Sequence, residues 1–311
     1  MHSGLRFRAE LLTGVEAACR GPRPHSAATR DLAVAVIEAT DHALRESEAL
    51  AAAGDAGQPV AVGIVEKSVG DYVTALDLGL DRQLGRVLTA IRGVPIVSEE
   101  GPAPDDMHAL PEAWLIDPLD GTTASICGEL GLCGPMVAHL EHGVPRASVM
   151  LSLDGTTLGL AERGAGAAVL RVDAGGARWL PGDAFDRIGT LRQGCVLFNP
   201  QSDAARSHPA FAALHAALRT GRHTLAIESR MPHSMASLAL GMHRRLAVVH
   251  DNSAEFPKQM AWDVLPVQLW VEERGGVFWG IDGRPYDVRR PMPIIAATRA
   301  DIAEQLVRLA G

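Results

Sequence analysis

The stretch W-L-I-D-P-L-D-G-T at 114–122 constrains the fold and chemistry of this chain more than any other. Its apolar residues 114–116 predict the end of a buried strand. The proline that follows fixes its own φ and the glycine lets a ligand approach the backbone, so Asp117 and Asp120 are expected on a tight turn. Thr122 is placed to begin a helix, whose exposed N–H groups could hold a phosphate while the carboxylates hold hard cations. Alone, the pattern also fits an ordinary Asp-Pro turn with a threonine N-cap.

Three further carboxylates occupy comparable places in the sequence. Glu99 follows the apolar strand predicted over 94–97, Asp77 closes the stretch D-Y-V-T-A-L-D, and Asp263 opens a helical pattern after Trp262. Each of them taken singly fits a surface carboxylate. Carboxylates contributed by separate segments are also the ligands that magnesium prefers.

These motifs together resemble the inositol monophosphatase family, the magnesium-dependent, lithium-sensitive phosphatases. The matching elements are Lys67, D-Y-V-T-A-L-D at 71–77, Glu99-Glu100, W-L-I-D-P-L-D-G-T at 114–122, Trp262-Asp263 and E-R-G-G at 273–276. Their order and spacing follow the family over roughly residues 30–310. The resemblance implies a layered αβαβα fold, a site between two lobes, and a homodimer.

The pattern of apolar residues predicts an α/β protein with two lobes. Residues 1–28 form an N-terminal extension, 29–185 an α+β lobe that carries most of the metal ligands, and 186–311 an α/β lobe with Asp263 and the specificity segment. Helices are expected at 31–52 and 77–91. Short apolar runs separated by turns over 135–172 predict an antiparallel sheet.

Composition argues against several classes of protein. The 29 basic residues against 37 acidic ones give a net charge of −8, and no long basic run offers a surface for nucleic acid. The four cysteines match no zinc pattern. No apolar run is long enough to span a membrane and no signal-peptide core is evident, so a cytoplasmic protein is expected. Zinc-hydrolase and serine-hydrolase motifs are absent from the sequence.

The resemblance also assigns ligands for two or three Mg²⁺ ions. These ligands are Asp77, Glu99, Asp117, the carbonyl of Leu119, Asp120 and Asp263. Asp117 would bridge two of the ions, and Asp77 with Glu99 would hold a weaker third through waters. Such ions neutralise the phosphate and lower the pKa of a bound water.

The nucleophile implied by the resemblance is a metal-bound water. The hydroxyl of Thr122 would accept its hydrogen bond, oriented by Asp77 or Glu99. The N–H groups of Gly121 and Thr122 would donate hydrogen bonds to phosphate oxygens, and Lys67 would lie near the phosphate or the third metal.

The sequence departs from the family where the family selects its substrate. Residues 123–125 read T-A-S in place of the usual T-N-F, and 233–236 read H-S-M-A in place of G-S-A-A. The acid that binds inositol hydroxyls would fall near His250, and the segment after it is longer than usual. The candidates for substrate specificity are Arg230, His233, Ser234, His250, Glu255 and Lys258.

The sequence therefore predicts a magnesium-dependent phosphomonoesterase for a small polyol, sugar or nucleoside phosphate. Two alternatives on the same fold are a 3′-phosphoadenosine-type nucleotidase and a fructose-bisphosphatase. An enzyme of a specialised biosynthetic pathway would explain the altered specificity segment. A non-catalytic, metal-binding regulatory protein is a fourth alternative, against which the full set of carboxylates argues.

Overall fold

The computed structural model describes most of the chain, and the description below is confined to those residues. They are residues 4–18, 25–53, 64–68, 71–102, 106–180, 190–191, 194–199, 208–220, 225–228, 231–240, 245–251, 261–290 and 292–311.

The larger of the two main sheets has seven strands, which neighbour one another in chain order from β3 to β9. The strands are β3 (Ile96–Ser98), β4 (Glu112–Asp120), β5 (Gly134–Glu141), β6 (Val144–Leu151), β7 (Thr157–Glu162), β8 (Gly166–Asp173) and β9 (Gly176–Leu180). β3 and β4 are parallel, and each later pair is antiparallel. The antiparallel sheet predicted over 135–172 is thereby confirmed.

The second sheet has five strands in the order β11-β10-β12-β14-β13. They are β10 (Cys195–Asn199), β11 (Leu225–Glu228), β12 (Arg245–His250), β13 (Val277–Gly280) and β14 (Ile294–Ala297). β10 is parallel to both β11 and β12, whereas β14 is antiparallel to its two neighbours. A short hairpin of β1 (Val65–Ser68) and β2 (Asp71–Val73) lies outside both sheets.

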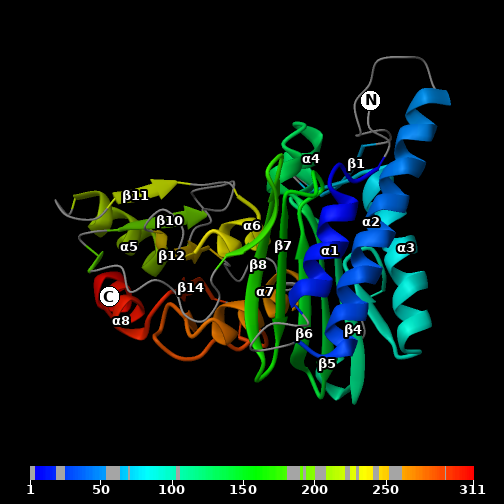
Figure 1. Ribbon diagram of the computed structural model, residues 1–311. Coiled ribbons are helices and arrows are strands. Elements are labelled where there is room, and N and C mark those ends of the chain that lie inside the picture. Colours follow the sequence, from blue (N-terminus) through cyan, green and yellow to red (C-terminus); the bar gives the residue numbers. More distant parts are fainter. Residues whose placement is uncertain are drawn as a thin grey trace.

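Helices separate and cover the two sheets, which gives the five-layered αβαβα arrangement that was predicted (Figure 1). α2 (Ala27–Ala53) and α3 (Ala75–Ile91) cover the outer face of the larger sheet. α6 (His233–Leu238) and α7 (Ala261–Glu273) lie between the sheets, and α5 (Pro209–Thr220) and α8 (Ala300–Ala310) cover the far face of the smaller one. α4 (Thr122–Ile126) follows β4 directly.

Helix α7 shows why this arrangement forms. An amphipathic surface helix has one apolar stripe, whereas a helix that is apolar on all sides must be buried. Nine of its thirteen residues are buried, among them Trp262, Leu269 and Trp270. Its side chains pack with those of both sheets in one apolar cluster, so α7 holds Asp263 at a fixed place between the lobes.

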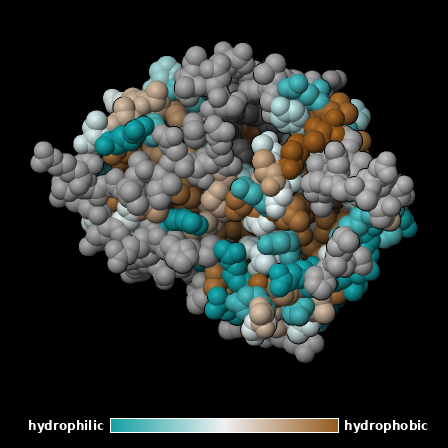
Figure 2. Space-filling model, turned by 90° about the horizontal axis from the view of Figure 1, so that it is seen from above, coloured by the Kyte–Doolittle hydropathy of each residue, from teal (hydrophilic) through white to brown (hydrophobic). Residues whose placement is uncertain are grey.

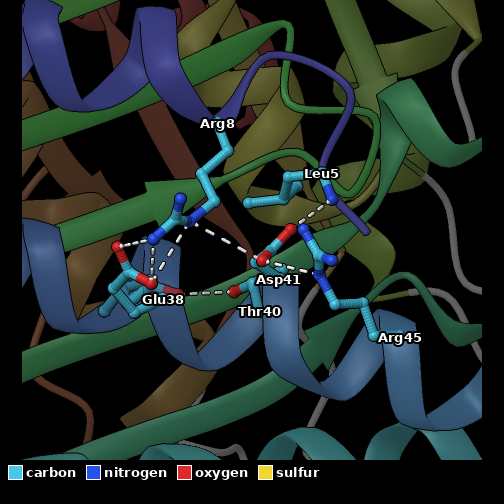
Figure 3. A network of polar contacts seen from close by, with 7 residues as sticks. Leu5, Arg8, Glu38, Thr40, Asp41 and Arg45 are labelled. Carbon is cyan, nitrogen blue, oxygen red and sulfur yellow. Dashed lines mark hydrogen bonds and ion pairs between the residues drawn. The ribbon is translucent and has the colours of Figure 1, made fainter. Parts of the chain in front are cut away.

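The N-terminal helix α1 (Arg8–Ala18) packs on α2, on the edge strand β9 and on its neighbour β8. Leu11 and Val15, two residues of α1 itself, are fully buried. Arg8 donates two hydrogen bonds from Nη2 to Glu38, at 2.5 and 2.6 Å, while the N–H of Leu5 donates to Asp41 at 2.8 Å (Figure 3). The described part of the N-terminal extension is therefore docked on the larger lobe.

Within the described ranges, no helix combines the length and the apolar character needed to cross a bilayer. Seen from the end of the molecule that carries α4, hydrophilic and hydrophobic side chains interleave across the described residues (Figure 2). Strand β4 ends at this face, which is where the predicted metal ligands gather.

Candidate active site

Two of the predicted ligands come together because β3 and β4 are parallel. Ser98 pairs with Ile116 in the register of these strands. The N–H of Glu99 then donates to the carbonyl of Ile116 at 3.1 Å. Residues that follow parallel strands leave the sheet at the same edge, so Glu99 and Asp117 lie side by side.

Asp117 lies at the centre of an acidic group. Its side chain is 1% exposed. Burial, followed by the negative charges of Glu99, Asp263 and Asp120, holds the pKa of Asp117 well above its usual range, and a hydrogen bond with Asp263 acts in the same direction. The first turn of α7 supplies Asp263. The structure thus gathers four of the predicted metal-ligating carboxylates from three separate segments.

Asp77 joins this group through Thr122. It is the third residue of α3, where its carboxylate accepts from the N–H of Thr74 at 2.9 Å in a capping box. Its other oxygen, Oδ1, accepts from the hydroxyl of Thr122 at 2.9 Å. Burial raises the pKa of Asp77, and the hydrogen bonds from Thr74 and Thr122 oppose that shift. Of the two carboxylates expected to orient the Thr122 hydroxyl, Asp77 is therefore the one that accepts its hydrogen bond, and the catalytic role of that pair stays a prediction.

The segment that carries Asp117 and Asp120 differs from the predicted turn. β4 does not end at Ile116 but continues to Asp120, with an irregularity between the pairs that Asp117 and Asp120 form with β5. The reversal comes one residue later, at Gly121, where φ is +91°. Local turn residues predicted the break, but the partner strand β5 supplies hydrogen bonds that extend β4 through the proline as a bulge.

Thr122 is also not a helix N-cap, the role that it would have in an ordinary Asp-Pro turn. Gly121 occupies the N-cap of α4 without any side-chain hydrogen bond, and Thr122 is the first helical residue. Its hydroxyl is directed to Asp77 and lies 3.3 Å from the carbonyl of Leu119. The N–H of Leu119 donates to Asp117 at 2.9 Å, so one small loop joins three of the predicted site residues.

The donor set fits a hard divalent cation. The negative charges of Glu99, Asp120 and Asp263 all act on the buried carboxylate of Asp117. Like charges that are buried together destabilise a site until a cation lies between them. Oxygen donors of this kind match magnesium better than a soft metal.

The structure describes the predicted specificity residues unevenly. Arg230, Glu255 and Lys258 lie outside the described residues. The backbone places Lys67 in β1 and makes His233 the first residue of α6. His250 ends β12, is 1% exposed, and places Nδ1 3.1 Å from the amide nitrogen of Asn199.

Ser234, another predicted specificity residue, has a partner that the sequence did not indicate. Its side chain is fully buried. Its N–H and hydroxyl both donate to Oδ2 of Asp120, at 2.7 and 2.5 Å. These bonds cross from the smaller lobe to the larger one, and no local pattern in the sequence could have revealed them.

A second group of potential metal ligands lies at the opposite end of β4 and was also missed. Glu112, His139 and Glu141 offer ligand atoms within 4.8 Å of one another. Arg92 bonds to Glu112, and Arg146 donates to Glu141 at 2.9 Å. Only the β4–β5 register, in which Glu112 faces Glu141, could have shown this grouping. Protein cations already pair with its carboxylates, so it is distinct from the acidic group around Asp117.

Comparison with known proteins agrees with the motifs. The model of the inositol monophosphatase family matches residues 24–310. A probable inositol 1-monophosphatase, ImpA of Mycobacterium tuberculosis, is 34% identical over 87 residues. That similarity spans 27% of this chain and only 30% of the relative.

Solved structures share the fold. The extragenic suppressor protein SuhB from Bartonella henselae superposes with a TM-score of 0.71 at 19% identity, covering 92% of this chain and 98% of that one. An IMPase/NADP phosphatase crystallised with Mg²⁺ and phosphate has a TM-score of 0.62 at 17% identity, covering 79% and 86% of the two chains. These similarities confirm the predicted fold class.

Proposed function

The chain belongs to the inositol monophosphatase family, and from this premise we propose that it is a magnesium-dependent phosphomonoesterase. Its substrate would be a small polyol, sugar or nucleoside phosphate. The observation that carries the proposal is the gathering of Glu99, Asp120 and Asp263 around the buried Asp117. Such a concentration of negative charge serves a hydrolase that must bring cations to an anionic ester.

The same carboxylates, with Asp77 and the carbonyl of Leu119, would hold two or three Mg²⁺ ions. Bound there, magnesium would neutralise the phosphate, lower the pKa of water and stabilise the leaving oxygen. The requirement for cations follows from charge, because a site this acidic would otherwise repel a phosphate monoester.

Thr122 would take part in activating the attacking water. Its hydroxyl donates to Asp77, which fixes the hydrogen of the hydroxyl and leaves oxygen lone pairs able to accept from a water. The buried Thr74–Asp77 capping box holds the carboxylate in turn. The chain Thr74–Asp77–Thr122 therefore orients one acceptor toward the acidic group.

The turn at Gly121 would receive the phosphate. Its positive φ places the N–H groups of Gly121 and Thr122 at the start of α4, where they could donate to phosphate oxygens. Lys67 is a further candidate for this contact, as its place before the 71–77 stretch predicted.

The leaving group would meet a pocket that differs from the inositol-binding one. His233 begins α6 at a position where the resemblance predicts glycine, and the hydroxyl-binding acid of the family would fall near His250, the last residue of β12. Without that acid, a hydroxyl-rich ring leaves polar groups unpaired, which is costly. We therefore expect inositol monophosphate to be a poor substrate.

Phosphate release from a panel of esters tests the proposal. The panel would contain inositol 1-phosphate, sugar phosphates, 5′- and 3′-nucleotides and fructose 1,6-bisphosphate, each with excess chelator and with added Mg²⁺. We expect turnover only with Mg²⁺. Full turnover in chelator would contradict the metal mechanism, and inositol 1-phosphate as the best substrate would contradict the altered pocket.

His233 offers a direct test of specificity. Replacing His233 by Gly should change the ratio of kcat/KM values among the panel substrates roughly 10-fold, the order of effect expected of a small pocket change. The concentration of Mg²⁺ needed for half-maximal activity should stay the same. A uniform loss across all substrates would show that His233 does not contact the leaving group.

A cytoplasmic location, expected from the sequence, and a homodimer, implied by the family resemblance, are further proposals. Sedimentation of the purified full chain measures the second of these directly, and a monomer at micromolar concentration would contradict it.

A further inference from the structure

The two lobes are joined at Asp120, whose carboxylate is held by the first turn of α6. Asp120 is 6% exposed and Ser234 is fully buried. Both donors of Ser234, the backbone N–H and the hydroxyl, bond to the same oxygen, Oδ2. Two hydrogen bonds to one carboxylate oxygen fix the rotation of that side chain, and neither of them engages the other oxygen, Oδ1.

The residue next to Asp120 is fixed by the same part of the smaller lobe. A Cβ atom added to Gly121 would lie 2.3 Å from Cγ of Pro232 and 3.1 Å from Cβ of Cys133. The N-cap residue of α6, Pro232, therefore packs directly against the turn that follows β4. The packing of the Pro232 ring against Gly121 and the two hydrogen bonds from Ser234 to Asp120 therefore join the lobes at the same point.

We propose that Ser234 is a positioning residue that orients Asp120 for metal binding. The inference rests on the proposed function, in which Asp120 is a magnesium ligand. Asp120 lies close to the negative charges around Asp117, which push its carboxylate away when no cation is present. Ser234 opposes this movement from the other lobe, so the metal site is complete only when α6 is docked against β4.

The proposal gives Ser234 a role distinct from contact with the leaving group. Groups that hydrogen bond to a metal ligand fix its orientation, and their loss typically weakens metal binding about 10- to 100-fold. A residue that selects the substrate would instead change relative kcat/KM values at unchanged metal affinity.

Helix α6 supplies a matched control in Ser237. It lies one turn after Ser234 and is equally buried, with 0% exposure for both side chains. Among the described residues, its hydroxyl has no hydrogen-bond partner. Replacing either serine by alanine removes the same atom from the same helix, but only one of the two changes removes a bond to Asp120.

The test compares Mg²⁺ binding by the full-length wild type, S234A, S234T and S237A. Isothermal titration calorimetry without substrate gives the dissociation constant for Mg²⁺, and thermal unfolding in chelator reports whether each variant is folded. We expect S234A to bind Mg²⁺ about 10- to 100-fold more weakly. S237A should stay within about 2-fold of wild type, and S234T, which retains the hydroxyl, should recover most of the loss.

A double mutant locates the effect at Asp120. In a D120A background, S234A should change the Mg²⁺ dissociation constant by less than about 2-fold, because the side-chain oxygen that accepts from Ser234 is already gone, whereas Asn would retain an acceptor. S234C has a side chain of similar size that is only a weak hydrogen-bond donor, so its Mg²⁺ affinity should match that of S234A. If S234A does not fold, S234C takes its place in the comparison.

Three results would overturn the proposal: wild-type Mg²⁺ affinity in S234A, an equal loss in S237A, or no Mg²⁺ binding by the wild type. The calorimetric readout separates this failure from failure of the proposed function. A protein whose Mg²⁺ affinity depends on Ser234 and Asp120 as proposed, but which hydrolyses no ester, would contradict only the phosphatase assignment.

Discussion

Strand β4 carries an acidic group at each of its ends, and the two groups have opposite electrostatics. At the end of the strand, burial and neighbouring negative charges raise the pKa of Asp117 far above its usual range. At its start, burial also acts to raise the pKa of Glu112, but hydrogen bonds from Arg92 and His139 prevail and lower it. Only five positions along one strand separate the two carboxylates.

The difference shows how a structural ion pair can be told from a binding site. Around Glu112 the chain supplies its own cations, so the charges are balanced and partly exposed to water. Around Asp117 the carboxylates destabilise one another in a buried place, which is a cost to folding unless a cation binds. The first group balances its own charge at the surface of the sheet, whereas the second carries the excess negative charge that the proposed cations would offset.

The largest expected effect follows from neutralising Asp117. D117N should lower kcat at least about 1,000-fold, equivalent to roughly 4 kcal/mol in barrier, because the residue would contact two ions. In chelator, the free energy of unfolding should be equal to or greater than that of wild type, since one of several repelling charges is gone. Phosphate-release kinetics and urea unfolding measure the two quantities.

The matched control for D117N is E112Q, in the same strand. Its activity should stay within about 2-fold of wild type, because no ion pair at that end reaches the site. A comparable loss of activity in both variants would break the contrast between the two ends of β4.

A smaller effect is expected at the hydroxyl that bridges Asp77 to the site. T122A should lower kcat roughly 100-fold, as for loss of a group that accepts a proton, at nearly unchanged affinity for Mg²⁺. T122S keeps the hydroxyl and should retain most of the activity. Wild-type kcat in T122A would show that this hydrogen bond only supports the turn.

The smallest effect is the pH-dependent stability provided by Glu112. Its pKa is lower in the folded than in the unfolded protein, so its contribution is present above the unfolded pKa and is lost as pH falls through the folded value. At pH 7, the free energy of unfolding of E112Q should be up to about 1 kcal/mol lower than that of wild type, which is the usual size of a surface ion pair's contribution. The gap should narrow as the pH falls through the folded pKa, and a gap that stays constant on acidification would contradict the assignment to charge.

The sequence predicted the layered fold and the segments that converge on the acidic group, but it misplaced the end of β4. Proline and glycine after Ile116 favoured a tight turn. The strand continues instead to Asp120 because β5 pairs with it on both sides of the irregularity, at Asp117 and at Asp120. Pairing with the next strand of the sheet therefore outweighed the local turn preference, and the reversal lies at Gly121 rather than directly after Ile116.

What the sequence determined by itself were the residue types at fixed spacing: carboxylates after apolar strands, a glycine where φ is positive, and an apolar helix that had to be buried. Such features depend on neighbours within a few positions, so they can be read from the order of residues. The tertiary structure alone decided which groups face one another, as in the bonds from Ser234 to Asp120 and the pairing of Glu112 with Glu141. These contacts depend on strand register and on the docking of two lobes, which arise from packing over the whole chain rather than from any local motif.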